Sequence, residues 1–127
     1  MRKVAMLAAS LTVLVLVAAT AVYAVNKTCA SKPCRGTNMR DTLYERNGNR
    51  VSDAIYGLKS ADRINAGTFE KDRDQLYGAP GNDKLNAVDD DGNDNLNGGP
   101  GIDTCNGDIG ADFGDVGTSC EKGNLAD

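Results

Sequence analysis

The chain contains no histidine and no tryptophan, and its 127 residues include only four tyrosines and two phenylalanines. Without histidine, the commonest general base of enzymes is missing. The few serines lie in no nucleophile-elbow motif. The formal net charge of −4, with no basic stripe, argues against a nucleic-acid partner. We therefore expect a binding or structural protein and not an enzyme.

The amino-terminal residues have the pattern of an export signal. A short basic start, Met1 to Lys3, precedes an apolar run from Val4 to Val17, and small residues lead up to Ala24. This pattern predicts a signal peptide over residues 1–24 and a secreted, extracellular protein with no membrane attachment after cleavage. The alternative is a retained single-span anchor, because the apolar segment is nearly long enough to cross a bilayer.

An aspartate followed two positions later by an aliphatic residue recurs along the chain. The pairs are Asp41/Leu43, Asp53/Ile55, Asp62/Ile64, Asp74/Leu76, Asp83/Leu85, Asp94/Leu96 and Asp103/Cys105, with Asp112/Gly114 as a weak last copy. The aspartates are 9 to 12 residues apart, and alternate copies are 18 to 21 apart. Such a period is typical of a solenoid whose coil has two short strands and two turns. We expect an all-β, right-handed parallel β-roll or β-solenoid of about four coils over residues 36–115, between caps at 25–35 and 116–127.

Four cysteines in an exported chain favour two disulfides. The short separation of Cys29 and Cys34 favours a bridge in the amino cap, and Cys105 would then join Cys120 and staple the last coil to the tail. The other two pairings remain open. A four-cysteine zinc site is disfavoured because neither close pair has the usual two-residue gap.

The turns combine glycine with oxygen-bearing side chains. A turn G-x-x-G-x-D directs carbonyl oxygens inward and ends on a carboxylate, while the aliphatic residue two positions later points into the coil. Calcium prefers six to eight such hard oxygens. Since one turn offers too few, equivalent turns of stacked coils would share an ion.

Residues 98–106, GGPGIDTCN, resemble the nonapeptide calcium-binding repeat of RTX (hemolysin-type) proteins, if Cys105 takes the aliphatic position. Residues 78–86 miss one glycine, residues 89–97 keep the third glycine, the aspartate and the leucine, and residues 107–115 lack the aliphatic residue. The resemblance implies a parallel β-roll with calcium in its turns. It divides the chain into degenerate coils at 36–77 and calcium-binding coils at 78–115.

Charge supports the same division. Residues 36–56 and 57–77 each have no net charge, whereas residues 78–97 and 98–115 each carry −4. Stacked carboxylates without cations repel one another, so the second half should need a metal to be compact. We expect two or three Ca²⁺ ions there, with the turn ending at Asp83 paired to that ending at Asp103, and Asp94 to Asp112. Residues 36–77 can pair their own charges and should be a metal-free scaffold. The candidate ligands are Gly78, Pro80, Gly81, Asn82, Asp83, Asp90, Gly92, Asn93, Asp94, Gly99, Gly101, Asp103, Asp108, Gly110 and Asp112.

These expectations describe a secreted calcium-binding β-roll in which calcium is a folding and stabilising ligand. The alternative is a metal-independent, disulfide-capped solenoid that serves as a surface structural or interaction module. Outward-facing Tyr56 and Tyr77 would suit contact with an extracellular protein or a glycan, although they would also simply cover the strand edges. Stacked asparagines, at 65, 86 and 106, would form a hydrogen-bonded ladder.

Overall fold

The computed structural model describes residues 23–30, 33–46, 51–67, 72–90, 92–109 and 114–125. Within these ranges the chain forms strands and turns and no helix, and nothing described is a helix long and apolar enough to cross a membrane. Most of the predicted signal peptide lies outside the described residues.

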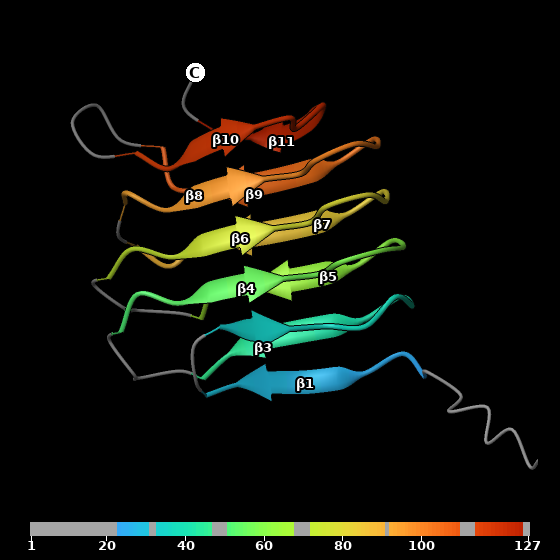
Figure 1. Ribbon diagram of the computed structural model, residues 1–127. Helices are drawn as coiled ribbons and strands as arrows, with labels where there is room; N and C mark the ends of the chain where they lie inside the picture. The colour runs from blue at the N-terminus through green and yellow to red at the C-terminus, as the bar shows by residue number, and fades with distance from the viewer. Residues whose placement is uncertain are drawn as a thin grey trace, which may run out of the picture.

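Eleven short strands alternate between two parallel sheets, as expected for a solenoid. The strands are β1 (Asn26–Cys29), β2 (Cys34–Arg35), β3 (Thr42–Glu45), β4 (Ala54–Tyr56), β5 (Arg63–Asn65), β6 (Gln75–Tyr77), β7 (Lys84–Ala87), β8 (Asn95–Asn97), β9 (Thr104–Gly107), β10 (Val116–Thr118) and β11 (Lys122–Asn124). The odd-numbered strands form one sheet and the even-numbered strands form the other, each in sequence order. Figure 1 shows the coils stacked from the blue amino-terminal end to the red carboxyl-terminal end.

Each coil has a tight turn and a wide turn. The tight turns join even strands to odd strands, as in residues 57–62, 78–83 and 98–103, and they stack at the right of Figure 1. The wide turns join odd strands to even strands at the opposite edge. The steps of 11 or 12 residues between repeat aspartates therefore span the wide turns, and the steps of 9 up to Asp103 span the tight turns.

The core holds one aliphatic side chain from most strands, as the Asp-to-aliphatic offset predicts. Strand register aligns one column in each sheet, and all of these side chains are buried: Leu43, Ile64, Leu85 and Cys105 in one sheet, Cys34, Ile55, Leu76 and Leu96 in the other. Lys27 begins the first column, Gly123 ends it and Gly117 ends the second. The columns therefore lose their large apolar residues where the stack ends.

Both predicted disulfides are present, Cys29–Cys34 and Cys105–Cys120. The segments predicted as caps also supply strands: β1 and β2 extend the sheets at the amino end, and β10 and β11 extend them at the carboxyl end. Each bridge therefore lies where a sheet has no further coil to pair with.

The second position of the tight turn requires a positive φ angle. Gly99 has φ of 91°, and the equivalent residues of the two preceding coils are Ala79 at 69° and Leu58 at 86°. A side chain in this region costs about 1–2 kcal/mol relative to the right-handed region. The two upstream turns, which lack a glycine at this position, thus carry backbone strain that the coil at 98–106 avoids.

Candidate metal centre

Two columns of buried carboxylates run along the stack. The first, here the tight-turn ladder, comprises Asp41, Asp62, Asp83 and Asp103, each directly before an odd strand and at most 1% exposed. The second, the wide-turn ladder, comprises Asp53, Asp74, Asp94 and Asp115, each directly before an even strand and at most 5% exposed. Buried acids of this density require either partners or neutralisation.

Each ladder is joined by hydrogen bonds from backbone to carboxylate. The Asp41 N–H donates to Asp62 Oδ1, the Asp62 N–H to Asp83 Oδ1 and the Asp83 N–H to Asp103 Oδ1, all at 2.7 Å. The wide-turn ladder repeats the pattern over 2.7 to 3.0 Å. Glu121 ends the tight-turn ladder by accepting from the Asp103 N–H. One oxygen of each carboxylate therefore links two coils.

The second carboxylate oxygen has a hydrogen-bond donor at Asp41 and Asp115 but not at several other ladder residues. Asp41 Oδ2 accepts from the Thr37 N–H, and Asp115 Oδ2 accepts from the Asp108 N–H. In the described part of the chain, the buried Oδ2 atoms of Asp62, Asp83, Asp94 and Asp103 have no hydrogen-bond partner. A buried ionised oxygen without a donor is costly, so these positions favour a bound proton or a bound cation.

A carbonyl oxygen of the next coil lies near each of these atoms in the tight turns. A Cβ added at Gly57 would meet Asp62 Oδ2 at 2.5 Å and the Gly78 carbonyl oxygen at 2.9 Å. A Cβ added at Gly78 would likewise meet Asp83 Oδ2, with the Gly98 carbonyl oxygen at 2.6 Å. The absence of a side chain at the start of the turn thus lets two hard oxygens from successive coils approach the same stretch of backbone, and hard oxygens are the donors that calcium prefers.

Burial raises the pKa of the ladder carboxyls. The pKa of Asp62 and that of Asp83 rise to about 6, and that of Asp94 rises to about 8, because burial disfavours the charged form. Burial also raises the pKa of Asp103 and Asp115. The backbone N–H donors and the neighbouring ladder acids act in opposite directions on these values, and burial dominates.

These shifts predict that the metal-free protein is stabilised by acid. Because the ladder pKa values exceed the unfolded value of 3.8, the folded state holds protons that the unfolded chain releases, and stability falls as pH rises through 6 and then 8. In chelator, we expect the melting temperature to drop by more than about 5 °C between pH 5 and pH 8. Thermal unfolding followed by circular dichroism measures this, and a melting temperature that rises with pH over this interval contradicts it.

Several predicted turn ligands use their oxygens to stack one turn on the next. The Pro80 carbonyl accepts from the Ser60 N–H, the Pro100 carbonyl accepts from the Gly81 N–H, and Asn82 Oδ1 accepts from the Ile102 N–H, each at 3.0 Å. The structure therefore brings the predicted tight-turn residues together, including Gly99 and Gly101. Within this set, Asp83 and Asp103 are the residues whose buried oxygens have no hydrogen-bond partner.

In the wide turns, the structure places Asp90, Gly92 and Asn93 just before Asp94, and Asp108 on the next coil. Asp108 Oδ2 accepts from the Asp89 and Asp90 N–H groups, both at 2.9 Å. The predicted ligands Gly110 and Asp112 lie outside the described residues.

Asp115, not Asp112, is the residue in register with Asp94. The Asp94 N–H donates to Asp115 Oδ1, and Val116 pairs with Asn95. The pairing of Asp94 with Asp112 expected from the sequence followed the nine-residue step. The coil period would have identified Asp115, which lies 21 residues after Asp94 and two before Gly117.

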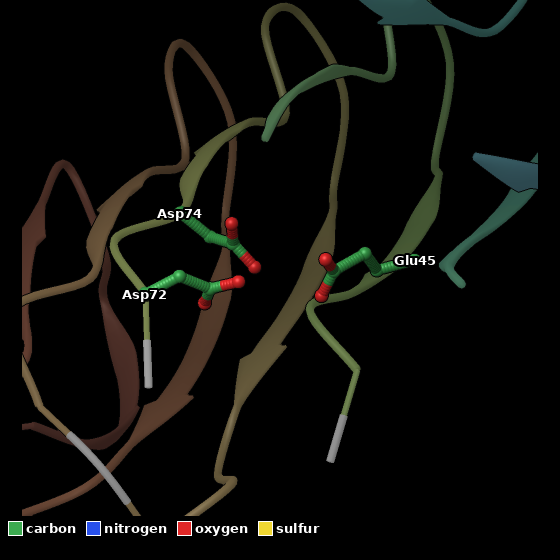
Figure 2. Close-up of side chains that lie close together, drawn as sticks. All are labelled: Glu45, Asp72 and Asp74. Carbon is green, nitrogen blue, oxygen red and sulfur yellow. The ribbon is translucent and has the colours of Figure 1, made fainter. Parts of the chain in front are cut away.

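A third group of acids, which the sequence analysis missed, lies on the wide-turn side of the amino-terminal half. Oxygens of Glu45, Asp72 and Asp74 all lie within 4.8 Å of one another, and Figure 2 shows the three carboxylates directed toward a common space. Glu45 and Asp74 are buried and Asp72 is half-buried. The structure therefore contains an acidic group with the composition of a metal site in coils predicted to be metal-free.

The outer faces of the sheets differ in character. On the even sheet, the Tyr56 and Tyr77 rings stack with centroids 4.8 Å apart, and the Arg35 guanidinium lies 4.7 Å from the Tyr56 centroid. On the odd sheet, register aligns the expected column of asparagines, preceded by Tyr44 and extended by Asn124. A shallow hollow of about 370 Å³ runs beside this column.

Comparison with known proteins gives no relative. No protein-family model matches the chain, and neither the curated proteins nor the solved structures that were searched contain a match.

Proposed function

We propose that this protein is an exported calcium-binding β-solenoid in which Ca²⁺ between stacked coils is a folding and stabilising ligand. The observation that carries the proposal is the set of buried Oδ2 atoms of Asp62, Asp83, Asp94 and Asp103, which have no hydrogen-bond partner among the described residues. In the tight turns, carbonyl oxygens of the next coil supply further donors. The resemblance of residues 78–106 to RTX repeats supports the same ion, and Asp83 and Asp103 are the central ligands.

The expected export of the protein would decide when calcium binds. Two disulfides favour an oxidising environment outside the cytoplasm, and the predicted signal peptide agrees with this. Extracellular calcium modules bind with dissociation constants on the order of 10⁻⁴–10⁻³ M. The ladder carboxylates would therefore bind calcium after export. Before export they would be protonated or would repel one another.

Calcium should raise the melting temperature of the oxidised protein. At ten times its dissociation constant, each ion adds about 1.4 kcal/mol to the free energy of unfolding. Two ions should therefore raise the melting temperature by more than about 10 °C at pH 7.5. Magnesium should do much less, because it requires shorter bonds and near-octahedral geometry. Circular dichroism melts in chelator, calcium and magnesium provide the measurement.

A double variant, Asp83→Asn with Asp103→Asn, is the matched control. Asparagine keeps the oxygen that accepts from the backbone N–H of the preceding coil and removes the charge, so the fold should persist in chelator. The calcium-dependent rise should fall to less than about half. Equal melting temperatures for the native protein in chelator and in calcium would contradict the proposal.

A metal-independent interaction module is the second candidate. The half-buried, stacked tyrosines and the exposed Arg35 on the even sheet favour it, since aromatic rings and a guanidinium suit contact with an extracellular glycan or protein. Under this function, the two asparagine substitutions leave stability in calcium unchanged, whereas Tyr77→Ala removes binding to the partner.

A further inference from the structure

Glu45 is the one large, charged residue in a column of small residues on the odd sheet. It is the last residue of β3, aligned with Cys29 in the preceding coil. Continuing the register places Ala66, Ala87 and Gly107 at the same position in the following coils. The fold therefore needs only a small side chain at this position. Alanine would meet the packing requirement, so packing does not explain a glutamate here.

The Glu45 side chain is buried, and in the described part of the chain its ionised carboxylate receives no hydrogen bond from a backbone group or a neutral side chain. The side chain is 3% exposed. A glutamate kept at such a position is explained most directly by a ligand that its carboxylate holds.

The carboxylate of Glu45 is aimed at two others from the following coil. Asp72 and Asp74 precede β6, and their oxygens approach those of Glu45 within 4.8 Å. Figure 2 shows Glu45 on one side of the space and the two aspartates on the other. Asp74 also accepts from the Asp53 N–H through Oδ1, which fixes its carboxylate in this direction. Three acids converging from two coils form a site for a hard divalent cation.

We propose that Glu45, Asp72 and Asp74 bind one divalent cation, with Ca²⁺ or Mn²⁺ as suitable ions, and that this ion joins the two coils of the amino-terminal half. The site lies outside the glycine turns and does not depend on the proposed calcium sites at Asp83 and Asp103. It also replaces the expectation that residues 36–77 are a metal-free scaffold, because equal numbers of acids and bases in a segment do not show where the charges lie.

Glu45→Ala is the direct test, because it installs the residue that the same column carries at 66 and 87. The number of ions bound by the oxidised protein is measured by calorimetric titration with Ca²⁺ and by native mass spectrometry. We expect the variant to bind one ion fewer than the native protein, with the affinity of the other sites unchanged within about twofold. In chelator the variant should be as stable as the native protein or more so, since a buried acid has been removed.

Two further variants separate this site from the proposed calcium sites. Glu45→Gln keeps the shape of the side chain and should also lose one ion, which guards against a packing effect of the alanine. Asp103→Asn should lose an ion from the turns, and the combination of Asp103→Asn with Glu45→Ala should lose both. If only the Glu45 variants lose an ion, the turn sites fail and this site stands. If the Glu45 variants bind as many ions as the native protein, with equal affinity, Glu45 is a protonated acid and the inference is overturned.

Discussion

Gly101→Val is expected to prevent stable folding of the solenoid. A Cβ at Gly101 would fall onto the Gly81 carbonyl oxygen of the preceding coil, with its carbonyl carbon 2.7 Å away. The obstacle is backbone, which cannot move aside without breaking the hydrogen bond from the Gly81 N–H to the Pro100 carbonyl. We expect a loss of more than about 4 kcal/mol, a large part of the roughly 5–15 kcal/mol of a typical domain.

Urea unfolding in excess calcium measures this loss. The matched control is Ile102→Val, one position along the same turn, where the side chain is 54% exposed. Its effect should stay within about 0.5 kcal/mol. A Gly101→Val protein that unfolds at the same urea concentration as this control would show that the tight turns do not stack as described.

Removal of the Cys105–Cys120 bridge should destabilise the protein by about 3 kcal/mol, since it closes a loop of 15 residues. Cys105 also occupies the core column directly after Leu85, so a double alanine variant loses packing as well. The last strands, β10 and β11, pair with the stack on one side only. We expect their backbone amides to lose protection against hydrogen exchange before those of β5 to β8.

The matched control is the double alanine variant of Cys29 and Cys34. This bridge spans only five residues, so its removal should cost about 2 kcal/mol and affect mainly the exchange of β1 and β2. Equal losses of stability from the two variants, with no local change in exchange, would contradict the role of each bridge as a cap.

The fold followed from the sequence because one spacing fixed several features together. Pairs such as Asp62/Ile64 and Asp83/Leu85 recur with the period of the coil, so the same offset predicts the buried column, the parallel register and the position of the acids. The observed disulfides are the pairing that the short separation of Cys29 and Cys34 favoured, whereas the sequence left the other two pairings open.

The site was predicted less completely, because it depends on contacts between coils. The sequence indicated Asp83 and Asp103 but could not show that one oxygen of each carboxylate is used by a backbone N–H and the other is left without a partner. Asp115 was missed because the nine-residue step of the tight turns was applied to the last wide turn, and because Gly117 replaces the aliphatic residue. Glu45 was missed because the net charge of its segment is zero, with Arg46 directly beside it in the sequence. The strand register instead buries Glu45 near Asp72 and Asp74.

The most direct measurement is a crystal structure of the oxidised protein grown with Ca²⁺, together with an anomalous difference map from crystals in which Mn²⁺ replaces it. We predict metal peaks about 2.3–2.6 Å from Oδ2 of Asp83 and Asp103 for calcium, with turn carbonyl oxygens of the adjacent coil completing the shell. A map with no metal at these two oxygens, in which each is protonated and bonded to a protein acceptor, would contradict the account.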